Sequence, residues 1–130
     1  MLVCLHSENI LKKAYIIRKH DDFVKANTDG VFVRTDFFVL QARVNPRFSH
    51  YRVGVTASKR VGNAVVRNRC KRRLRALADL SICNKSKNVD YVFIARTGLN
   101  VADWSLLVNS ANKALKKIEE RISNVHKKSI

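Results

Sequence analysis

The sequence contains few acidic residues, and its central part contains none. Ten Asp and Glu residues stand against 26 Lys and Arg residues, which gives a formal net charge of +16, and no acid lies between Asp36 and Asp79. A protein that hydrolyses phosphodiesters by itself usually holds divalent metal ions with clustered carboxylates. The two adjacent pairs, Asp21-Asp22 and Glu119-Glu120, are better explained by a helix start and a solvated helix face. The sequence therefore predicts no catalytic residue and no metal site in the protein.

Cysteine and histidine are also scarce. The three cysteines, Cys4, Cys70 and Cys83, are odd in number and lack the close spacing of zinc ligands or of a disulfide framework. The four histidines are scattered through the chain. We therefore expect a reducing compartment. The beginning of the sequence lacks the basic region and long apolar run of a secretory signal, so a cytoplasmic location is expected.

Long hydrophobic runs are missing as well, and none approaches the roughly 18 residues of a membrane-spanning helix. Hydrophobic residues nevertheless make up 46% of the chain, which indicates a folded protein, and 130 residues suffice for one domain with its own core. The pI near 10.4 favours nucleic acid as the partner. An anionic membrane surface is the weaker alternative, because the basic helix has a small apolar stripe without Trp or Phe.

Most of the excess charge lies between positions 52 and 75, where three patterns follow one another. Residues 51–57 alternate in polarity as a strand does, and residues 58–63 form a loop with Gly62 as turn residue and Asn63 as helix cap. From Ala64 onward the spacing is helical. The apolar stripe of this helix is Val66, Cys70, Leu74 and Leu77, and the cations of the stretch are Arg52, Lys59, Arg60, Arg67, Arg69, Lys71, Arg72, Arg73 and Arg75.

The remaining chain predicts an α+β fold in which a small mixed sheet is covered by helices. Strands are expected at residues 37–44 and 89–96, with a short one near 31–34, and residues 45–50 are expected to form a hairpin between the strands that flank them. Helices are expected at residues 20–26 and from a cap at Asn100 to Ile122, with Trp104 beginning the buried stripe. We expect an N-terminal extension at 1–10, one RNA-binding domain at 11–122 and a basic tail at 123–130.

The basic stretch also carries a specific motif. It reads Arg52-x-Gly54, then Ser58-Lys59-Arg60-x-Gly62-x-Ala64-Val65, then Arg67-Asn68-Arg69-x-Lys71-Arg72. This pattern resembles the signature of the bacterial ribonuclease P protein family, and the similarity extends roughly from Leu11 to Ile118. The resemblance implies a fold similar to a domain of a ribosomal protein, with an unusual left-handed βαβ crossover.

The resemblance also implies a function. Members of this family are accessory subunits of a ribonucleoprotein enzyme, in which the RNA subunit carries the active site and binds most of the Mg2+. The enzyme removes the 5′ leader from precursor tRNA by endonucleolytic cleavage. The implied RNA-binding residues are Arg52, Ser58, Lys59, Arg60, Asn63, Arg67, Asn68, Arg69, Lys71, Arg72 and Arg75.

A second implied site is a cleft for the single-stranded leader, lined by Phe23, Phe37, Val39 and Gln41. Asn27 and Gln41 stand where this family often has aromatic residues, so weaker stacking is expected there. The implied partners are the catalytic RNA and the precursor tRNA leader, with no membrane and no obligate protein partner. The main alternative is a non-catalytic ribosomal or assembly protein of the same fold, and only the motif around Arg67-Asn68-Arg69 favours the first interpretation. A nuclease that acts without RNA is disfavoured, because the few acidic residues do not form a cluster that could hold metal ions.

Overall fold

The computed structural model describes residues 16–82 and 88–128 of the 130-residue chain. Its elements in chain order are α1 (His20–Asp29), β1 (Val31–Arg34), β2 (Phe38–Val44), β3 (Arg52–Thr56), the 3-10 turn η2 (Lys59–Val61), α2 (Ala64–Ser81), β4 (Val89–Ala95), the 3-10 turn η3 (Leu99–Val101) and α3 (Trp104–Lys128). The expected extension at 1–10 lies outside the described residues. Helix α3 continues past position 122, where the sequence suggested that the domain ends.

The four strands form one mixed sheet in the order β1-β2-β4-β3, which confirms the α+β class. Strands β1 and β2 are antiparallel, β2 and β4 are antiparallel, and β3 runs parallel to β4. The expected hairpin between β2 and β3 is wrong, because β4 lies between these strands. Strand β4 is buried along nearly its whole length, and a strand with two apolar faces is most stable at the centre of a sheet.

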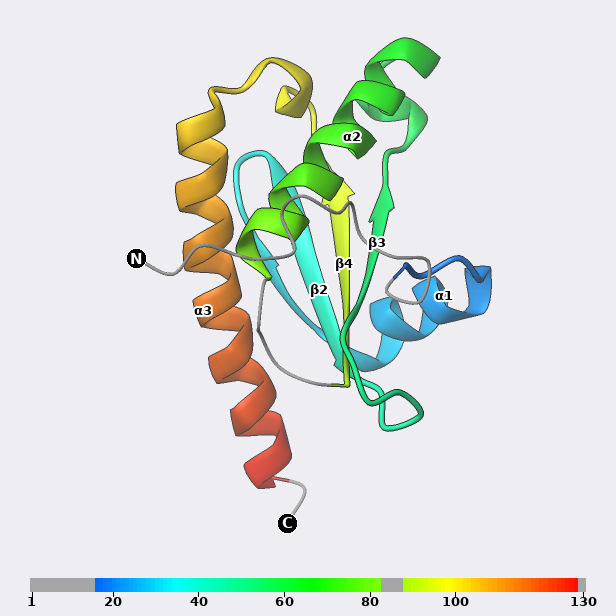
Figure 1. Ribbon diagram of the computed structural model, residues 1–130, viewed down its shortest axis with the longest axis vertical. Coiled ribbons are helices and arrows are strands. Elements are labelled where there is room, and N and C mark those ends of the chain that lie inside the picture. Colours follow the sequence, from blue (N-terminus) through cyan, green and yellow to red (C-terminus); the bar gives the residue numbers. More distant parts are fainter. Residues whose placement is uncertain (1–15, 83–87, 129–130) are drawn as a thin grey trace.

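The connection from β3 through α2 to β4 is left-handed. In Figure 1 both strands point upward, α2 crosses in front of the sheet, and β4 lies to the left of β3. A right-handed crossover would place the second strand on the right, and nearly all such connections take that form. The handedness that the family resemblance implied is therefore confirmed.

The two faces of the sheet are covered differently. Helices α2 and α3 lie together on the face that is toward the viewer in Figure 1, and α1 lies on the opposite face. We call these the α2/α3 face and the α1 face. The main core fills the α2/α3 face, where the rings of Phe38 and Phe93 pack with their centroids 5.6 Å apart. The predicted stripe of α2 contributes Cys70, Leu74 and Leu77, all fully buried.

Both long helices begin at side-chain caps. Oδ1 of Asn63 accepts a hydrogen bond from Val66 N at 3.0 Å, which confirms the predicted cap of α2. Helix α3 begins at Trp104 instead of directly after Asn100, because Asn100 belongs to the turn η3. The capping residue is Asp103, whose Oδ2 accepts hydrogen bonds from Leu106 N at 3.4 Å and from the Ser105 hydroxyl.

Candidate nucleic-acid interface

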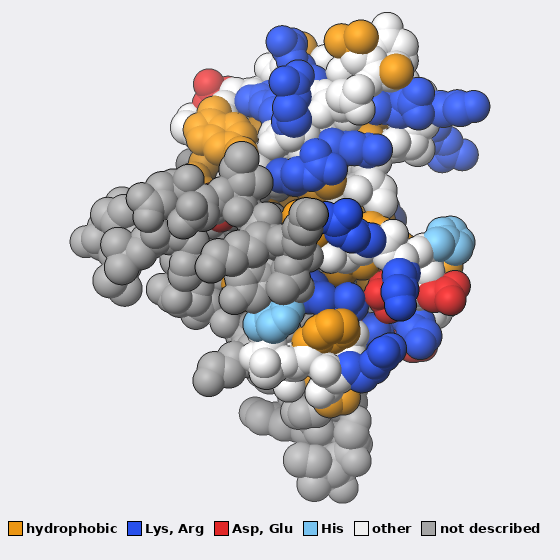
Figure 2. Space-filling view, turned by 45° about the vertical axis from the view of Figure 1, so that its right-hand side comes forward, with side chains coloured by type: hydrophobic (Ala, Val, Ile, Leu, Met, Phe, Trp, Pro, Cys, Tyr) orange, Lys and Arg blue, Asp and Glu red, His pale blue; other side chains and the backbone are white. Residues whose placement is uncertain are grey.

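The cations of η2 and α2 form a continuous basic region on the outside of the molecule. We call it the cationic surface, and it consists of Lys59, Arg60, Arg67, Arg69, Lys71, Arg72 and Arg75. Arg67 and Lys71 are half-buried, and the others are exposed, as is Asn68 among them. Within the described ranges, no ion pair joins these side chains to a carboxylate. Figure 2 shows Lys and Arg side chains over much of the upper part of the molecule. Such unpaired clustered charge suits a polyanion.

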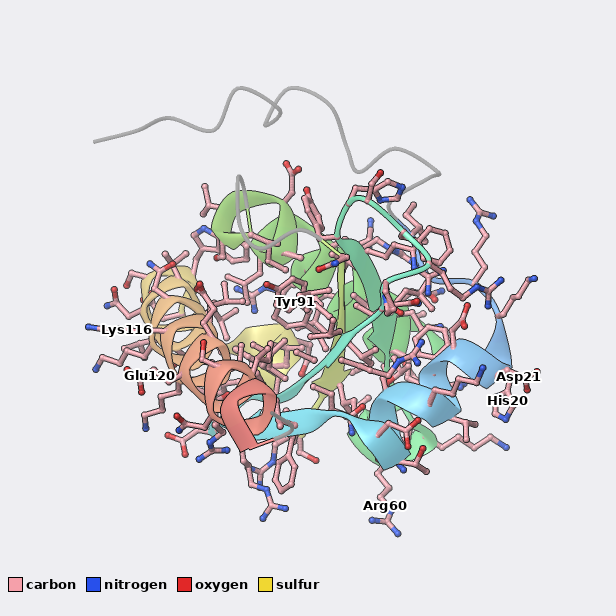
Figure 3. The ribbon with its side chains drawn as sticks, turned by 90° about the horizontal axis from the view of Figure 1, so that it is seen from below. His20, Asp21, Arg60, Tyr91, Lys116 and Glu120 are labelled. Atoms are coloured by element: carbon pink, nitrogen blue, oxygen red, sulfur yellow. The ribbon has the colours of Figure 1, made fainter. Side chains whose placement is uncertain are left out.

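The loop before α2 is shaped by two residues that the sequence placed among the RNA contacts. The hydroxyl of Ser58 accepts a hydrogen bond from Arg60 N at 3.3 Å and begins η2, while Asn63 caps α2. Between them, Gly62 has a φ of 147°, and a Cβ there would lie 2.8 Å from the side chain of Val66. Only glycine readily adopts this conformation. Figure 3 shows that Arg60 in this loop points toward the same side of the sheet as α1.

Arg52 is a correction to the predicted RNA-binding set, because it is buried at 6% exposure instead of lying on the cationic surface. Its Nε donates to Asp90 Oδ1 at 2.9 Å and its Nη2 to Asp90 Oδ2 at 2.7 Å. Nη1 reaches Asp22 of α1 at 3.4 Å, and the guanidinium lies 4.0 Å from the ring centre of Phe48. A guanidinium that pairs with two carboxylates and packs on an aromatic ring stabilises the fold and is not free to bind RNA.

Asp90 is the centre of this buried network. Its Oδ2 also accepts a hydrogen bond from Asn45 Nδ2 at 2.9 Å and lies 3.5 Å from Arg43 Nη2. Burial alone would raise the pKa of Asp90, but the hydrogen bonds from Arg52 and Asn45 and the charges of Arg52 and Arg43 lower it below its ordinary value. The hydrogen bond with Asp90 in turn raises the pKa of Arg52. Through the ion pairs of Arg52 with Asp22 and with Asp90, the network joins α1 to the sheet.

The α1 face has three successive rows that follow from the strand register. The first row is the charged Arg43–Asp90–Arg52, and the second is Gln41–Val92–Gly54. The third row, Arg34–Val39–Ile94–Thr56, is not fully buried at any position, and it ends next to the loop that carries Arg60. Because α1 packs on the first two rows through Asp22, Phe23 and Ala26, the third row is the part of this face that is open to a ligand.

Phe23 and Gln41, two predicted cleft residues, lie at the border between α1 and this open row. A Cβ on Gly54 would lie 2.5 Å from the ring of Phe23, so glycine allows that ring to lie against the sheet. Nε2 of Gln41 donates to Oδ1 of Asn27 at 2.9 Å. Val39 and Gln41 line a cavity of about 220 Å³ together with Asn27, Phe32 and Arg34. Asn27 and Gln41, the two positions where aromatic residues were expected, are thus hydrogen-bonded to each other at this cavity.

The fourth predicted cleft residue is Phe37. It precedes β2, is half-buried, and packs against the main core of the α2/α3 face. Its carbonyl accepts a hydrogen bond from Arg96 N at 2.9 Å. This hydrogen bond continues the pairing of β2 with β4 by one residue, so Phe37 keeps the strand alternation that it shares with Val39 and Gln41. Its place in the leader cleft stays a prediction.

A groove that sequence reasoning missed lies between α2 and η3. It has a volume of about 560 Å³ and is lined by Arg69, Arg72, Arg73, Ala76, Asn100, Val101, Ala102 and Trp104. Trp104 was expected to begin the buried stripe of α3, but it is 36% exposed, and Leu107 is the first fully buried residue of that helix. Helical spacing places Trp104 correctly on the helix, and it gives no signal that the helix end extends beyond the core.

Two further properties of the described residues concern metals and membranes. No group of three or more His, Cys, Asp and Glu side chains in residues 16–82 and 88–128 is arranged to hold a metal ion. No helix in those ranges is long and apolar enough to cross a bilayer.

A mixed sheet with a left-handed crossover, a cationic surface on the crossover helix and an open row beside it define a small α+β nucleic-acid-binding protein. Comparison with known proteins assigns the family. The family model described as Ribonuclease P matches residues 11–119, and the chain belongs to this family.

Individual relatives agree with this assignment. The chain is 39% identical over 107 residues to a ribonuclease P protein component of Streptococcus thermophilus, which covers 82% of this chain and 94% of the relative. It is 38% identical over 100 residues to that of Caulobacter vibrioides, covering 76% and 67%. The solved ribonuclease P protein of Staphylococcus aureus superposes with a TM-score of 0.70 at 33% identity, covering 80% of this chain and 94% of that one.

Family membership gives the chain a role in tRNA processing in association with ribonuclease P RNA. The same comparisons do not favour the alternative of a ribosomal or assembly protein of this fold.

Proposed function

We propose that this chain is the accessory subunit of a ribonuclease P whose RNA carries the active site, and that it binds both that RNA and the 5′ leader of precursor tRNA. The observation that carries the proposal is the cationic surface next to the open row of the α1 face. Its Lys and Arg side chains are exposed or half-buried and form no ion pair with the described carboxylates. Mg2+ is held mainly by the RNA in this proposal. The cytoplasmic location expected from the sequence is part of it.

The carboxylates of the described protein support this division of labour, because several already have structural partners. Asp22 and Asp90 pair with Arg52 in the interior, and Asp103 caps α3. A carboxylate that neutralises a buried guanidinium is not available as a metal ligand or general base without a large cost in stability.

The RNA subunit binds along α2 through the cationic surface. Each phosphate that a Lys or Arg neutralises releases condensed counterions, so this contact adds affinity without reading sequence. Arg67 is consistent with this assignment, since it forms no ion pair with a carboxylate among the described residues. The exposed part of this half-buried side chain is what a phosphate would contact.

The leader lies across the third row of the α1 face. Val39 and Ile94 offer half-buried apolar surface there, while Arg34 on one side and Arg60 from the loop supply positive charge. Single-stranded RNA is held by this combination of flat or apolar contacts with cations along the backbone. By neutralising phosphates where substrate and catalytic RNA meet, the protein allows RNA-bound Mg2+ to act at ordinary concentrations.

The test of this proposal compares precursor tRNA with mature tRNA as ligands of the reconstituted RNA–protein enzyme. Val39→Glu places a negative charge in the open row, and repulsion of about 1 kcal/mol should weaken binding of the precursor about fivefold while leaving mature tRNA unchanged. The matched control is Val24→Glu, which adds the same charge at an exposed position of α1. Equal effects on both ligands, or none from Val39→Glu in a folded variant, would contradict leader binding at this row.

A further inference from the structure

The groove between α2 and η3 combines positive charge with an exposed indole. Three arginines of α2 line one side of it, and Val101 and Trp104 line the other at 76% and 36% exposure. Its volume of about 560 Å³ lies in the range of roughly 300–1,000 Å³ typical of small-ligand clefts. No acidic side chain is among the lining residues.

The groove is held in shape by Arg73, which is half-buried at its base. Nη1 of Arg73 donates to the carbonyl of Leu99, and Nη2 donates to the carbonyl of Ala102, both at 2.7 Å. The guanidinium also lies 5.7 Å from the ring centre of Trp104. These contacts join α2 to the turn η3 and orient the indole, so Arg73 is a positioning residue. Arg69 and Arg72 are exposed and form no ion pair within the described part of the chain.

The charges around the groove favour an anionic ligand with a flat apolar part. The nearest carboxylate to Trp104 along the chain is Asp103, and it accepts the hydrogen bonds that begin α3. The groove therefore presents two exposed guanidinium groups beside an aromatic face. A nucleotide has this chemistry, since its phosphate pairs with arginine and its base stacks on an aromatic ring.

We propose that this groove binds one unpaired nucleotide of the RNA held along α2, with the base stacked on Trp104 and the adjacent phosphates contacted by Arg69 and Arg72. The proposal rests on the function proposed above and adds a second kind of recognition to it. Because the groove is formed by α2, and α2 lies on the opposite side of the sheet from α1, its nucleotide is distinct from the leader on the α1 face. The contact reads the presence of an unstacked base, in addition to the charge of the backbone.

Trp104 is the only tryptophan of the chain, so its fluorescence reports directly on the groove. The first experiment titrates the full chain with an RNA hexamer of adenylates and, separately, with an abasic hexamer of the same charge. Stacking predicts quenching by the adenylate hexamer that the abasic hexamer does not produce. Equal quenching by both, or by neither, would overturn the proposal, because the indole would then respond to charge alone or to nothing.

Variants of the full chain supply a second measurement. Trp104→Leu should weaken binding of the adenylate hexamer about 5- to 150-fold, the usual effect of losing one base–aromatic stack, and Trp104→Phe should restore most of the affinity. The matched control is Leu106→Ala, which removes an exposed apolar side chain from the same turn of α3 outside the groove and should change the affinity less than twofold. Equal affinities of the Trp104→Leu variant and the unaltered chain would overturn the proposal.

This result is separable from the function proposed above. If the chain stimulates cleavage of precursor tRNA by ribonuclease P RNA but shows no base-dependent quenching, the groove is not a nucleotide site and the accessory role stands. If quenching occurs without stimulation, the groove binds single-stranded RNA and the accessory role fails.

Discussion

The two faces of the sheet use the same four strands for different purposes. The α2/α3 face is covered by two long helices and contains the main core, in which Phe38, Leu40 and Phe93 are fully buried. The α1 face is covered by one ten-residue helix, and its three rows pass from a buried charged network to an open surface. The first face supplies most of the hydrophobic stabilisation, and the second leaves the side chains of its third row partly or fully exposed.

The comparison shows how a strongly basic protein keeps its binding surface apart from its stability. The cations that stabilise the fold, Arg52 and Arg73, are paired with a carboxylate or with carbonyl groups. The cations of the cationic surface have no such partners among the described residues, and they are available to RNA. Substitutions that break the partnered group should therefore change unfolding, and substitutions in the unpartnered group should change binding.

The largest effect on stability is expected at the charged row of the α1 face. It would show that this face, and not only the core of the α2/α3 face, contributes strongly to stability. Asp90→Ala leaves the buried Arg52 without its main partner and should lower the free energy of unfolding by about 3–5 kcal/mol. Urea denaturation measures this value. The control Asp21→Ala removes an exposed acid from the first turn of α1 and should change the free energy by less than about 1 kcal/mol. Similar small effects from both variants would show that the network is not structural.

The same carboxylate predicts a pH dependence. Because the pKa of Asp90 is lowered in the folded protein, its stabilising effect is fully present above the ordinary aspartate pKa of about 3.9 and is lost as the pH falls through that value toward the native pKa. The difference in unfolding free energy between the unaltered chain and Asp90→Asn should therefore shrink below about pH 4. A difference that stays constant between pH 7 and pH 3 would contradict the lowered pKa.

The next largest effect on stability is expected in the main core of the α2/α3 face. It tests whether core packing can be changed without changing RNA binding. Leu74→Ala creates a cavity in the main core and should cost about 2–5 kcal/mol, with RNA affinity within twofold when measured where the variant is folded. Leu80→Ala, on the same helix at 47% exposure, is the matched control and should cost much less. A large loss of RNA affinity in folded Leu74→Ala would mean that core packing and binding are not separable.

The smallest effect on stability is expected on the cationic surface. Removing two phosphate contacts with Arg67→Ala and Lys71→Ala should reduce the slope of log affinity against log salt by about two, since each contact contributes roughly 0.9. The control pair Lys113→Ala and Lys117→Ala removes two exposed cations with the same spacing from α3 and should leave the slope unchanged. An unchanged slope in the first pair would exclude both residues as phosphate contacts.

The sequence predicted those parts of the structure that depend on local pattern. The stripe through Cys70, Leu74 and Leu77 and the cap at Asn63 follow from helical periodicity and capping chemistry, and both are confirmed. The motif around Arg67 identified the family because its residues and spacing are specific. The handedness of the crossover came with that resemblance, since spacing carries no information about it.

The parts that the sequence did not predict depend on contacts between distant positions. Arg52 looked like one more surface cation because its partner, Asp90, lies 38 positions away. Strands β2 and β3 looked like a hairpin because neighbours in the chain usually pair, whereas the doubly apolar β4 takes the central position. The groove at Trp104 requires α2 and η3 to come together, and no periodicity in either segment indicates that.

The central claim is that the protein assists a catalytic RNA instead of cleaving RNA itself. Its most direct test is a cleavage assay on precursor tRNA at low Mg2+, with the protein alone, a bacterial ribonuclease P RNA alone, and the two together. The account predicts cleavage at the mature 5′ end only in the mixture. Cleavage by the protein alone, or no stimulation of the RNA despite tight binding, would contradict it.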